Sequence, residues 1–514
     1  MIVSRSQGAG MEWRKAAAEA DAIAQTWMTE GGPGGAVVLF DRQTICAEAY
    51  GGLASIEQDR PFGADTAVRY ASISKHFLCA LVARLDGIGF DDRLGSHLDL
   101  PPALAKVTVG RALDMTGGIP DAMETLWLLG VSPSTTLDRA VLLRFACGLD
   151  ALNFPAGGEI SYSNTGYRLV QAALEARGPD YRALLAEHFF HPLNLGIRLP
   201  EDESEPVPRL ATGYWRAGDG WRRGRYGLHY SASGGLAGSA RDLATWVQAI
   251  MAGSGPADGV LARLGALRHL ADGRPTGYGL GLARASIGDG VAIGHGGSLP
   301  GFKNHFLMAP GLGAGVVVVS NREDTDAQAL ARRVLAALTS AAPPGPATDL
   351  LPEGRFVAED GPFWLEQNNG VVDWLGAKQV LHRGADGTAA GDAAHLPIRL
   401  ERVPGGIAGE IGHVARRFRP VPADLPAPAA WVGTWVCAAQ DARFDIAVSG
   451  GVASLSGSVG PTRTTCTMQP MRADLALVDR DNGGPWRQRV AVQFDGDEAR
   501  LVTNRSRVLR FRRG

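Results

Sequence analysis

Two stretches rich in proline and alanine divide the chain into one long part and two short parts, and this division constrains its fold more than any other feature. The stretches lie at 341–349 (AAPPGPATD) and 420–430 (PVPADLPAPAA), and such composition is typical of linkers between folded units. A chain of 514 residues is also too long for one ordinary hydrophobic core. We therefore expect one domain at 1–341, a second at 350–420 and a third at 430–514.

The first part mixes strand and helix patterns in an order typical of an α+β domain. Strand-like runs lie at 36–40 and 44–50 and return between 278 and 320, whereas helical patterns and glycine loops fill 72–250. A last helical pattern follows at 327–338. This order predicts an antiparallel sheet built from both ends of the domain, flanked by helices and interrupted by a helical subdomain.

The two short parts read as strands separated by Gly and Asp turns, without a long helical stripe. They open in a similar way, with Gly354-Arg355-Phe356 in one and Gly433-Thr434-Trp435 in the other. We predict two small antiparallel β-barrels related by a weak internal duplication. Two unrelated β-segments would also fit the pattern.

Composition and charge exclude several classes of partner. The net charge is −2 and arginine is scattered rather than clustered, so we expect no nucleic-acid partner. No run approaches the ~20 apolar residues of a membrane span, and the first residues lack the apolar centre of a signal peptide. Five widely spaced cysteines without a zinc-type spacing predict reduced thiols, a cytoplasmic location and no metal or cofactor.

A serine and a lysine stand one helical turn apart at the start of a helical stripe. Ser72 and Lys75 precede apolar residues at 77, 78, 81, 82 and 85, and none of the other four lysines has a serine three residues before it. The spacing places both side chains on one helical face. Lysine can accept the serine proton if burial and nearby positive charge lower its pKa. A helix-capping serine beside a solvated lysine would give the same residues.

A tyrosine and an asparagine form the second motif. Tyr162 and Asn164 follow a turn signal at 155–158 and lie where a loop enters a helical pattern. A tyrosine there can relay a proton from a lysine, and an asparagine amide offers both a donor and an acceptor to a substrate amide. A surface loop with local side-chain-to-backbone bonding would also account for the pair.

The third motif is the run His295-Gly296-Gly297-Ser298, which lies between strand-like runs. Glycines beside a strand edge allow the backbone of a substrate to approach closely. A lone histidine is more often structural than catalytic, and we expect this of His382, which is also followed two residues later by glycine.

Taken in this order, Ser-x-x-Lys, Tyr-x-Asn and a strand with a basic residue before x-Gly resemble the penicillin-recognising serine hydrolases, which include β-lactamases and D-Ala-D-Ala peptidases. The runs DTAVRYASISK, ALDMTGGIPD and SASGGLAGSARDLATWV add to the resemblance, which covers roughly residues 20–340. Within this family, HisGlyGly and the two-part C-terminal extension are similar to the bacterial D-stereospecific aminopeptidases. Many relatives carry lysine where this chain has His295, and that lysine helps to bind a substrate carboxylate. A largely neutral histidine puts carboxylate recognition in doubt.

The resemblance implies a role for each motif residue. Ser72 would be the nucleophile, Lys75 its base and Tyr162 part of the proton relay to the leaving group. His295 would orient the Tyr162 hydroxyl or stabilise the intermediate. The implied substrate contacts are the acyl-side amide at Asn164 and the oxyanion donors of the backbone at Ser72 and Ser298, beside Gly297.

The resemblance also implies a contribution from the last barrel. In the D-stereospecific aminopeptidases a loop from this barrel reaches the catalytic cleft, and we place 479–486 there. A carboxylate at Asp481 or Asp479 could hold a substrate α-ammonium. A solvated hairpin turn would fit the same residues.

The function implied is that of a serine peptidase. It would remove an N-terminal D-amino acid, such as D-alanine, from short peptides, amides or esters through an acyl-enzyme on Ser72, and a homodimer is one allowed assembly. The alternatives are an esterase or β-lactamase-like hydrolase on the same scaffold, or a penicillin-binding receptor that is acylated without turnover.

Overall fold

The computed structural model describes residues 12–178, 180–288, 290–339, 345–384, 386–449, 452–459, 462–481 and 483–514. Positions 341–344 of the first expected linker and Asn482 of the expected active-site loop lie outside these ranges. Among the described residues, no helix combines the length and apolar character that crossing a lipid bilayer would require.

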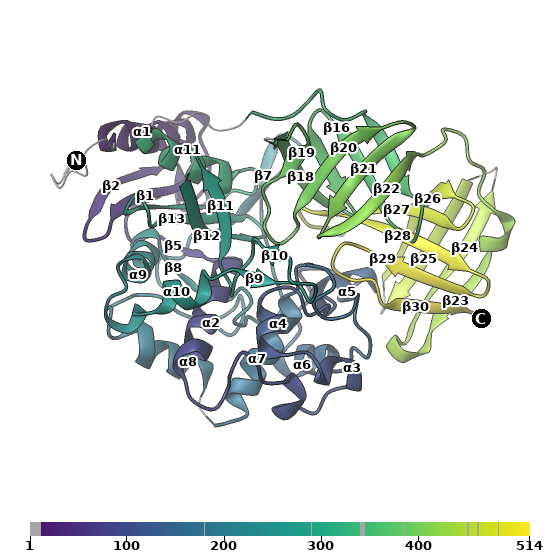
Figure 1. Ribbon diagram of the computed structural model, residues 1–514, viewed down its shortest axis with the longest axis horizontal. Helices are drawn as coiled ribbons and strands as arrows, with labels where there is room; N and C mark the ends of the chain where they lie inside the picture. Colours follow the sequence, from purple (N-terminus) through teal and green to yellow (C-terminus); the bar gives the residue numbers. More distant parts are fainter. Residues whose placement is uncertain are drawn as a thin grey trace.

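A six-stranded antiparallel sheet forms the centre of the first part of the chain (Figure 1). In spatial order its strands are β11 (Ala283–Ile287), β12 (Gly290–Leu299), β13 (Phe302–Ala309), β14 (Ala314–Ser320), β1 (Gly35–Asp41) and β2 (Ile45–Gly51). Because β1 pairs with β14, strands from both ends of this part lie side by side. The predicted α+β sheet is confirmed.

Helices cover both faces of this sheet. On one face α1 (Trp13–Glu30) and α11 (Ala327–Thr339) share a core with alternate residues of β1, such as Val37 and Leu39. On the other face α2 (Lys75–Arg84) and α9 (Ala240–Ala252) pack against the remaining residues, such as Val38. Burial on both faces explains why β1 and β14 are apolar along their whole length rather than alternating.

The helical subdomain lies below the sheet in Figure 1 and occupies the middle of the first part of the chain. Its helices are α3 (Pro102–Ala105), α4 (Val109–Leu113), α5 (Ala122–Leu128), α6 (Arg139–Cys147), α7 (Asn164–Glu175) and α8 (Tyr181–Leu185), and α10 (Val260–Leu264) follows α9. A short pair, β5 (Ala67–Arg69) with β8 (Ala237–Ser239), connects the segments that flank this subdomain. The other short strands are β3 (Leu53–Ser55), β4 (Arg60–Pro61), β6 (Tyr214–Ala217), β7 (Gly220–Arg223), β9 (Arg268–His269) and β10 (Pro275–Thr276).

Two closed antiparallel barrels of eight strands follow, which confirms the predicted barrels. The first comprises β15 (Gly354–Ala358), β16 (Trp364–Asn368), β17 (Val371–Trp374), β18 (Ala377–Arg383), β19 (Ala389–Gly391), β20 (Ile398–Val403), β21 (Gly406–Ile411) and β22 (Val414–Pro420). The second comprises β23 (Gly433–Cys437), β24 (Ala442–Ser449), β25 (Val452–Val459), β26 (Thr462–Arg472), β27 (Leu475–Asp481), β28 (Arg487–Asp495), β29 (Glu498–Val502) and β30 (Leu509–Arg513). Both follow the order of the sequence around the barrel, as a duplication would produce.

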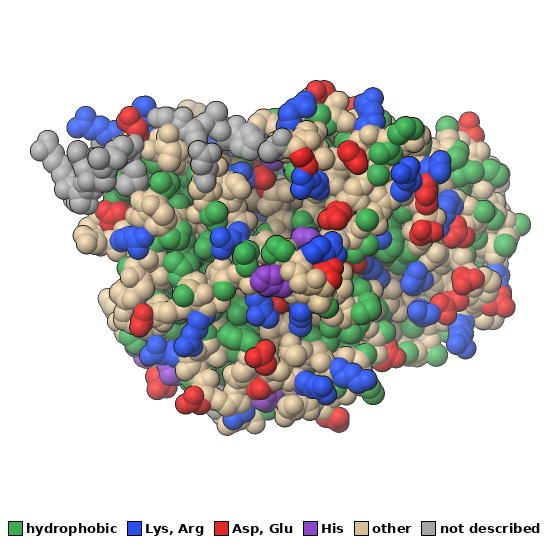
Figure 2. Space-filling view, viewed as in Figure 1, with side chains coloured by type: hydrophobic (Ala, Val, Ile, Leu, Met, Phe, Trp, Pro, Cys, Tyr) green, Lys and Arg blue, Asp and Glu red, His purple; other side chains and the backbone are tan. Residues whose placement is uncertain are grey.

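The barrels are packed on each other and on the helical subdomain. Leu477 and Ala491 of the second barrel belong to the buried core of the first. Leu128 and Leu129, at the end of α5, belong to the core of the second barrel. Figure 2 shows basic and acidic side chains intermixed over the visible face, in keeping with the net charge of −2.

Candidate active site

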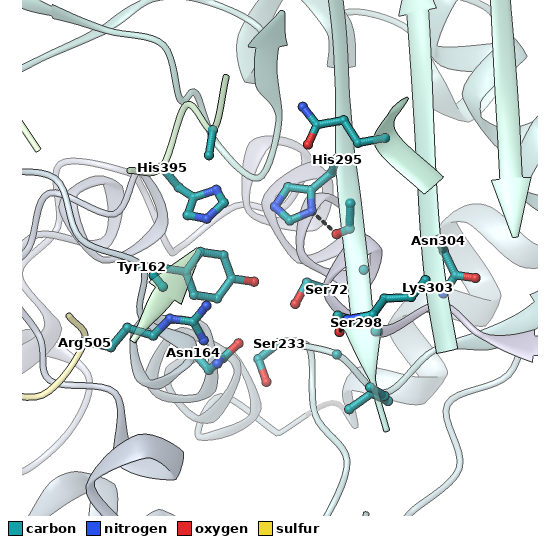
Figure 3. A pocket seen from close by; sticks show the side chains of 18 of the residues that line it. Ser72, Tyr162, Asn164, Ser233, His295, Ser298, Lys303, Asn304, His395 and Arg505 are labelled. Carbon is teal, nitrogen blue, oxygen red and sulfur yellow. Dashed lines mark hydrogen bonds between the residues drawn. The ribbon is translucent and has the colours of Figure 1, made fainter. Parts of the chain in front are cut away.

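A cavity of about 680 Å³ lies where the three parts of the chain meet. Its wall includes Ser72 and Tyr162 from the first part, His395 from the first barrel, and Trp486 and Arg505 from the second barrel. Figure 3 shows the side chains of Ser72, Tyr162 and His295 gathered around this space. Among the described residues, no His, Cys, Asp or Glu side chains are grouped in a way that could hold a metal ion.

The chain presents Ser72 on a tight turn at the end of a short strand. Strand β5 leads into the 3-10 turn η1 (Ala71–Ser74), and α2 begins at Lys75. Ala71 has a φ of 53°, a left-handed conformation that costs a residue with a Cβ about 1–2 kcal/mol. The surrounding packing maintains this strain, since Ala71 is buried. As a result Ser72 is half-buried and lines the cavity, whereas its neighbours on either side are buried.

Three oxygen atoms surround the amine of Lys75. Its Nζ lies 3.2 Å from Ser72 Oγ and 2.7 Å from Asn164 Oδ1, and it also donates to the carbonyl oxygen of Ser233. Asn164 Oδ1 and the Ser233 carbonyl can only accept hydrogen bonds. A neutral amine has two N–H bonds and one lone pair, so these two acceptors use both N–H bonds. The lone pair is then left to face the Ser72 hydroxyl.

Burial favours the neutral form of this amine. Lys75 is fully buried, and desolvation lowers its pKa well below the usual value. The negative charge of Asp121 acts in the opposite direction, while the positive charge of Arg505 lowers the pKa of Lys75 further. The geometry and the charges together fit a lysine that accepts the Ser72 proton.

Asn164 is oriented by an aspartate that precedes α5. Asp121 Oδ2 accepts hydrogen bonds from the backbone N–H of Asn164 at 2.7 Å and from its Nδ2 at 2.8 Å. Because the amide nitrogen faces Asp121, the amide oxygen must face Lys75. Asn164 was predicted to hold the substrate amide; it lines the cavity, but its side chain bridges Asp121 and Lys75.

The ring of Tyr162 lies among an amine, a guanidinium and an imidazole ring. Lys75 Nζ is 4.8 Å and Arg505 Cζ 4.6 Å from the ring centroid, and the ring meets His395 edge-on at 4.9 Å. Its hydroxyl points toward Ser72 (Figure 3) and makes no hydrogen bond of ordinary geometry to a described residue. Burial raises the pKa of Tyr162, while Ser72 and Arg505 act to lower it.

His295 lies on β12 and is bonded to a tyrosine that was not predicted. Its Nδ1 lies 2.5 Å from the Gly296 carbonyl oxygen and its Nε2 lies 2.8 Å from the Tyr278 hydroxyl. Burial, followed by the charge of Lys75, lowers the pKa of His295 well below its usual value. In the neutral ring Nδ1–H donates to the carbonyl, so Nε2 accepts from Tyr278. His295 was expected either to orient the Tyr162 hydroxyl or to stabilise the intermediate; the hydroxyl that it contacts is that of Tyr278, and its role toward the intermediate stays a prediction.

Strand β12 runs past Ser72, and along its last residues it pairs with another strand on one edge only. Its pairing with β11 ends at Gly294, while its pairing with β13 continues to Leu299. A Cβ at Gly297 would overlap the Tyr70 carbonyl oxygen, so this position requires glycine for η1 to approach the strand. Ser298 lines the cavity and its Oγ accepts a hydrogen bond from Lys303 at 2.7 Å.

The hairpin between β27 and β28 reaches the cavity, but not through its carboxylates. Asp481 is exposed, does not line the cavity, and accepts a hydrogen bond from the Gly483 N–H. Asp479 pairs with Arg487 at 2.8 Å. Trp486 instead forms part of the cavity wall, where it meets the Trp127 ring at 5.8 Å. The predicted substrate contact of Asp481 therefore has no counterpart in the cavity wall.

Sequence reasoning missed five groups that shape the site. They are Asp121, Ser233, Tyr278, His395 and Arg505. Asp121 and Ser233 lie in runs that added to the family resemblance, ALDMTGGIPD and SASGGLAGSARDLATWV, whereas Tyr278 lies at the start of the strand-like stretch that leads to His295. His395 and Arg505 lie in barrel loops whose local sequence carries no signal of a site.

Comparison with known proteins places this geometry in a family. A family model described as Beta-lactamase matches residues 20–340. The chain is 27% identical over 491 residues to a D-aminopeptidase of Cereibacter sphaeroides, a match that covers 88% of this chain and 92% of that protein. Two solved structures are similar in fold: the octameric penicillin-binding protein homologue from Pyrococcus abyssi (TM-score 0.54, 17% identity, 94% and 96% coverage) and D-amino acid amidase from Ochrobactrum anthropi SV3 (TM-score 0.54, 19% identity, 64% and 98% coverage). With more than half of its length matched by that family model, the chain belongs to the β-lactamase family and is a serine hydrolase.

Proposed function

We propose that this enzyme removes an N-terminal D-amino acid from short peptides, amides or esters through an acyl-enzyme on Ser72. The observation that carries the proposal is the set of contacts at the buried Lys75 amine, which lies 3.2 Å from Ser72 Oγ and donates to Asn164 Oδ1 and the Ser233 carbonyl oxygen, two atoms that can only accept. The stereochemical preference is supported by the similarity to proteins named D-aminopeptidase.

The reaction follows from the positions of these groups. Lys75 takes the Ser72 proton as Oγ attacks the substrate carbonyl. Backbone N–H groups of Ser72 and Ser298 are the proposed donors to the oxyanion, because the unpaired edge of β12 faces Ser72. Tyr162 returns a proton to the leaving amine, and water then releases the acid from Ser72.

An N-terminal substrate also carries an α-ammonium, and Glu124 is the carboxylate best placed to receive it. Glu124 lines the cavity on α5, three residues after the Asp121 that holds Asn164. Its ion pair with Arg505 is loose, at 3.8 Å, and its side chain is 15% exposed. The other carboxylates in the cavity wall are engaged elsewhere: Asp324 and Asp392 pair with arginines, and Asp326 accepts a hydrogen bond from the Ala329 N–H at the start of α11. We therefore assign ammonium binding to Glu124 rather than to Asp481.

Replacing Glu124 by glutamine is expected to raise the KM for D-alanine p-nitroanilide about 10- to 100-fold, because a charged hydrogen bond to the ammonium is lost. Acylation by p-nitrophenyl acetate, which has no ammonium, should change by less than about threefold. Steady-state kinetics with both substrates measures this. An unchanged KM for the D-alanyl substrate would remove Glu124 from the binding site.

The proposed function is tested with matched D- and L-amino acid p-nitroanilides, short esters and a chromogenic cephalosporin. We expect turnover of the D-amino acid substrates and a Ser72 adduct detected by mass spectrometry. Preferential cephalosporin or simple ester hydrolysis would favour a β-lactamase-like enzyme or an esterase. A stoichiometric burst without turnover would favour a receptor.

We also propose a cytoplasmic location and a homodimeric assembly. All five cysteines are free thiols, which supports a reducing compartment such as the cytoplasm. A homodimer is proposed from the sequence resemblance, and size-exclusion chromatography with light scattering tests it.

A further inference from the structure

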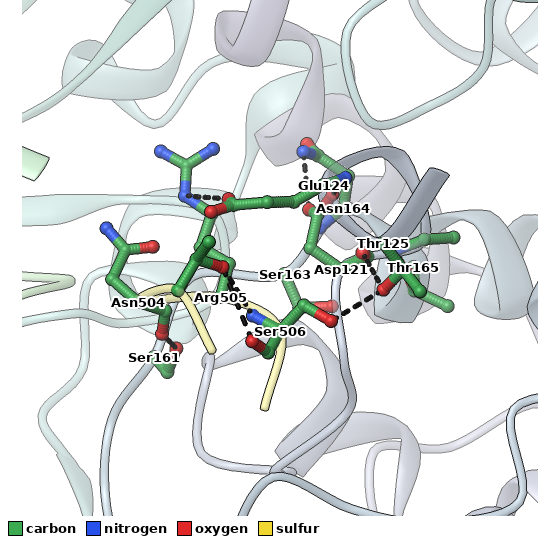
Figure 4. Close-up of polar contacts among 12 residues, drawn as sticks. Asp121, Glu124, Thr125, Ser161, Ser163, Asn164, Thr165, Asn504, Arg505 and Ser506 are labelled. Atoms are coloured by element: carbon green, nitrogen blue, oxygen red, sulfur yellow. Dashed lines mark hydrogen bonds and ion pairs between the residues drawn. The ribbon is translucent and has the colours of Figure 1, made fainter. Parts of the chain in front are cut away.

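The loop between β29 and β30 of the second barrel is fixed against the catalytic part of the chain. Hydrogen bonds connect the two: Asp121 N–H and Asn153 Nδ2 to the Arg505 carbonyl oxygen (both 2.9 Å), Ser161 Oγ to the Asn504 carbonyl oxygen (2.9 Å), and Thr125 Oγ1 with Ser506 Oγ (2.8 Å). Figure 4 shows this contact region. The loop is therefore attached to the segments that carry Asp121 and Tyr162.

A buried ion pair fixes the same loop at its far end. Arg507 donates to both carboxylate oxygens of Glu159 at 2.7 and 2.9 Å, and each of these side chains is only 7% exposed. Bidentate pairs of this kind set orientation as well as distance. The backbone of residues 504–507 is thus held at several points.

This loop directs Arg505 into the cavity. Arg505 Cζ lies 4.6 Å from the Tyr162 ring centroid, and Arg505 Nε lies 3.8 Å from Glu124 Oε2. The Arg505 side chain is 31% exposed and lines the cavity. A guanidinium over an aromatic ring holds the ring in place, and the attraction is stronger where water is partly excluded.

We propose that Arg505 is a positioning residue of the reaction: its guanidinium holds the Tyr162 ring against Ser72 and Lys75 and maintains a positive charge beside the proton relay. The second barrel would then complete the active site through this arginine. The inference rests on the proposed function for the role of Tyr162, and it adds a residue that none of the three motifs contains.

The positive charge of Arg505 affects the pKa values of both groups of the proton relay, Lys75 and Tyr162. The charged and titratable groups that face Lys75 and Tyr162 from the elements around them are Asp121, Glu124, Arg168, Arg505, Cys79, Tyr167, Tyr278, His295 and His395. Among them, Arg505 lowers the pKa of both Lys75 and Tyr162. Removing its charge must raise the pKa of Lys75, so a neutral lysine is reached only at higher pH.

Replacing Arg505 by methionine in the full-length enzyme tests this directly. In the wild type, the rate of the p-nitrophenol burst from p-nitrophenyl acetate should fall on the acidic side of its pH profile, which we call the acidic limb. In Arg505→Met this limb should lie about half to one pH unit higher than in the wild type, since one nearby positive charge is lost. Turnover of D-alanine p-nitroanilide should fall about 10- to 30-fold, a loss larger than that for the ester. The two substrates are compared in kcat, because only the D-alanyl substrate carries an ammonium and a disturbed Glu124 would change its KM. In kcat the anilide should lose more, because its leaving aniline must be protonated, which requires a positioned Tyr162.

Two further variants separate positioning from folding. Arg505→Lys keeps the cation and should restore most of the acidic limb. Arg510→Met changes an exposed arginine on β30 of the same barrel, paired only with Glu498 among the described residues, and should match the wild type. Thermal unfolding shows whether each variant is folded. If Arg505→Met is not folded, Arg505→Lys decides the question. A folded Arg505→Lys enzyme whose acidic limb lies a full pH unit above that of the wild type overturns the proposal, because its cation is still present.

The remaining outcomes also decide the question. The role of Arg505 is overturned if a folded Arg505→Met enzyme has the same acidic limb in its burst rate as the wild type and the same ratio of anilide to ester rates. An equal loss on both substrates, with no shift of the limb, assigns Arg505 a structural role only. If the wild type reacts with the ester but hydrolyses no D-amino acid substrate, the proposed function fails while the limb still tests Arg505.

Discussion

Ser72→Ala is expected to abolish acyl transfer, with a loss of kcat on the order of 10⁵-fold or more, as in other serine hydrolases deprived of their nucleophile. The fold should persist, because Ser72 is half-buried and its hydroxyl faces the catalytic cavity, beside the Lys75 amine and the Tyr162 hydroxyl, rather than the packed core. Steady-state turnover of D-alanine p-nitroanilide measures the loss, and thermal unfolding measures the stability.

Ser74→Ala is the matched control on the same turn. Ser74 is fully buried, and its Oγ donates to the Ala71 carbonyl at 2.7 Å and accepts from the Leu236 N–H at 3.0 Å. Its removal leaves these groups unsatisfied, which costs about 1–3 kcal/mol of unfolding free energy. We expect Ser74→Ala to lose stability and keep a burst, and Ser72→Ala to do the reverse. Near-normal turnover in Ser72→Ala would refute the acyl-enzyme mechanism.

Lys75→Met is expected to lower kcat/KM by about 10²- to 10⁴-fold, the usual contribution of a general base. Methionine retains most of the volume of the side chain but has no lone pair on nitrogen to accept the serine proton. The wild-type rate should also depend on pH, because only the neutral amine is a base. Burial lowers the pKa of Lys75, so kcat/KM should fall on the acidic side, at a pH well below the usual lysine value of about 10.4.

The pH profile and a second lysine give the controls for this prediction. Lys106→Met removes an exposed lysine at the end of α3 and should leave kcat/KM unchanged. The acidic limb should disappear from the residual rate of Lys75→Met. A Lys75→Met enzyme with the same acidic limb as the wild type would show that another group is the base.

Much of the fold could be predicted because it depends on local patterns. The apolar runs at β1 and β14 and the stripe of α2 set the strand and helix periods, and the proline-rich stretches predict the limits of the parts. Both barrels followed from short alternating runs between Gly and Asp turns. The closure of each barrel and the shared core at Leu477 and Ala491 depend on contacts between distant segments, which no local pattern records.

The residues of the candidate site also fall into two groups: those that the local sequence could predict and those that it could not. Ser72 and Lys75 are three residues apart, so helical geometry alone brings them together. Tyr162 and His295 were proposed from motifs, and their side chains line the same cavity. Asp481 was selected by its charge and its loop, but charge does not tell where a hairpin points. Arg505 was overlooked because arginines are common in this chain and its neighbours form no motif.

By itself, the sequence determined the pairing of Ser72 with Lys75, the α+β and barrel elements, and the order in which they are joined, because each depends on residues close together in the chain. Only the tertiary structure decided which acceptors hold the Lys75 amine, which tyrosine His295 binds, and which side chains of the barrel loops line the cavity. The physical reason is that these contacts join residues tens to hundreds of positions apart. Their geometry is set by how sheet, helices and barrels pack, and not by any spacing along the chain.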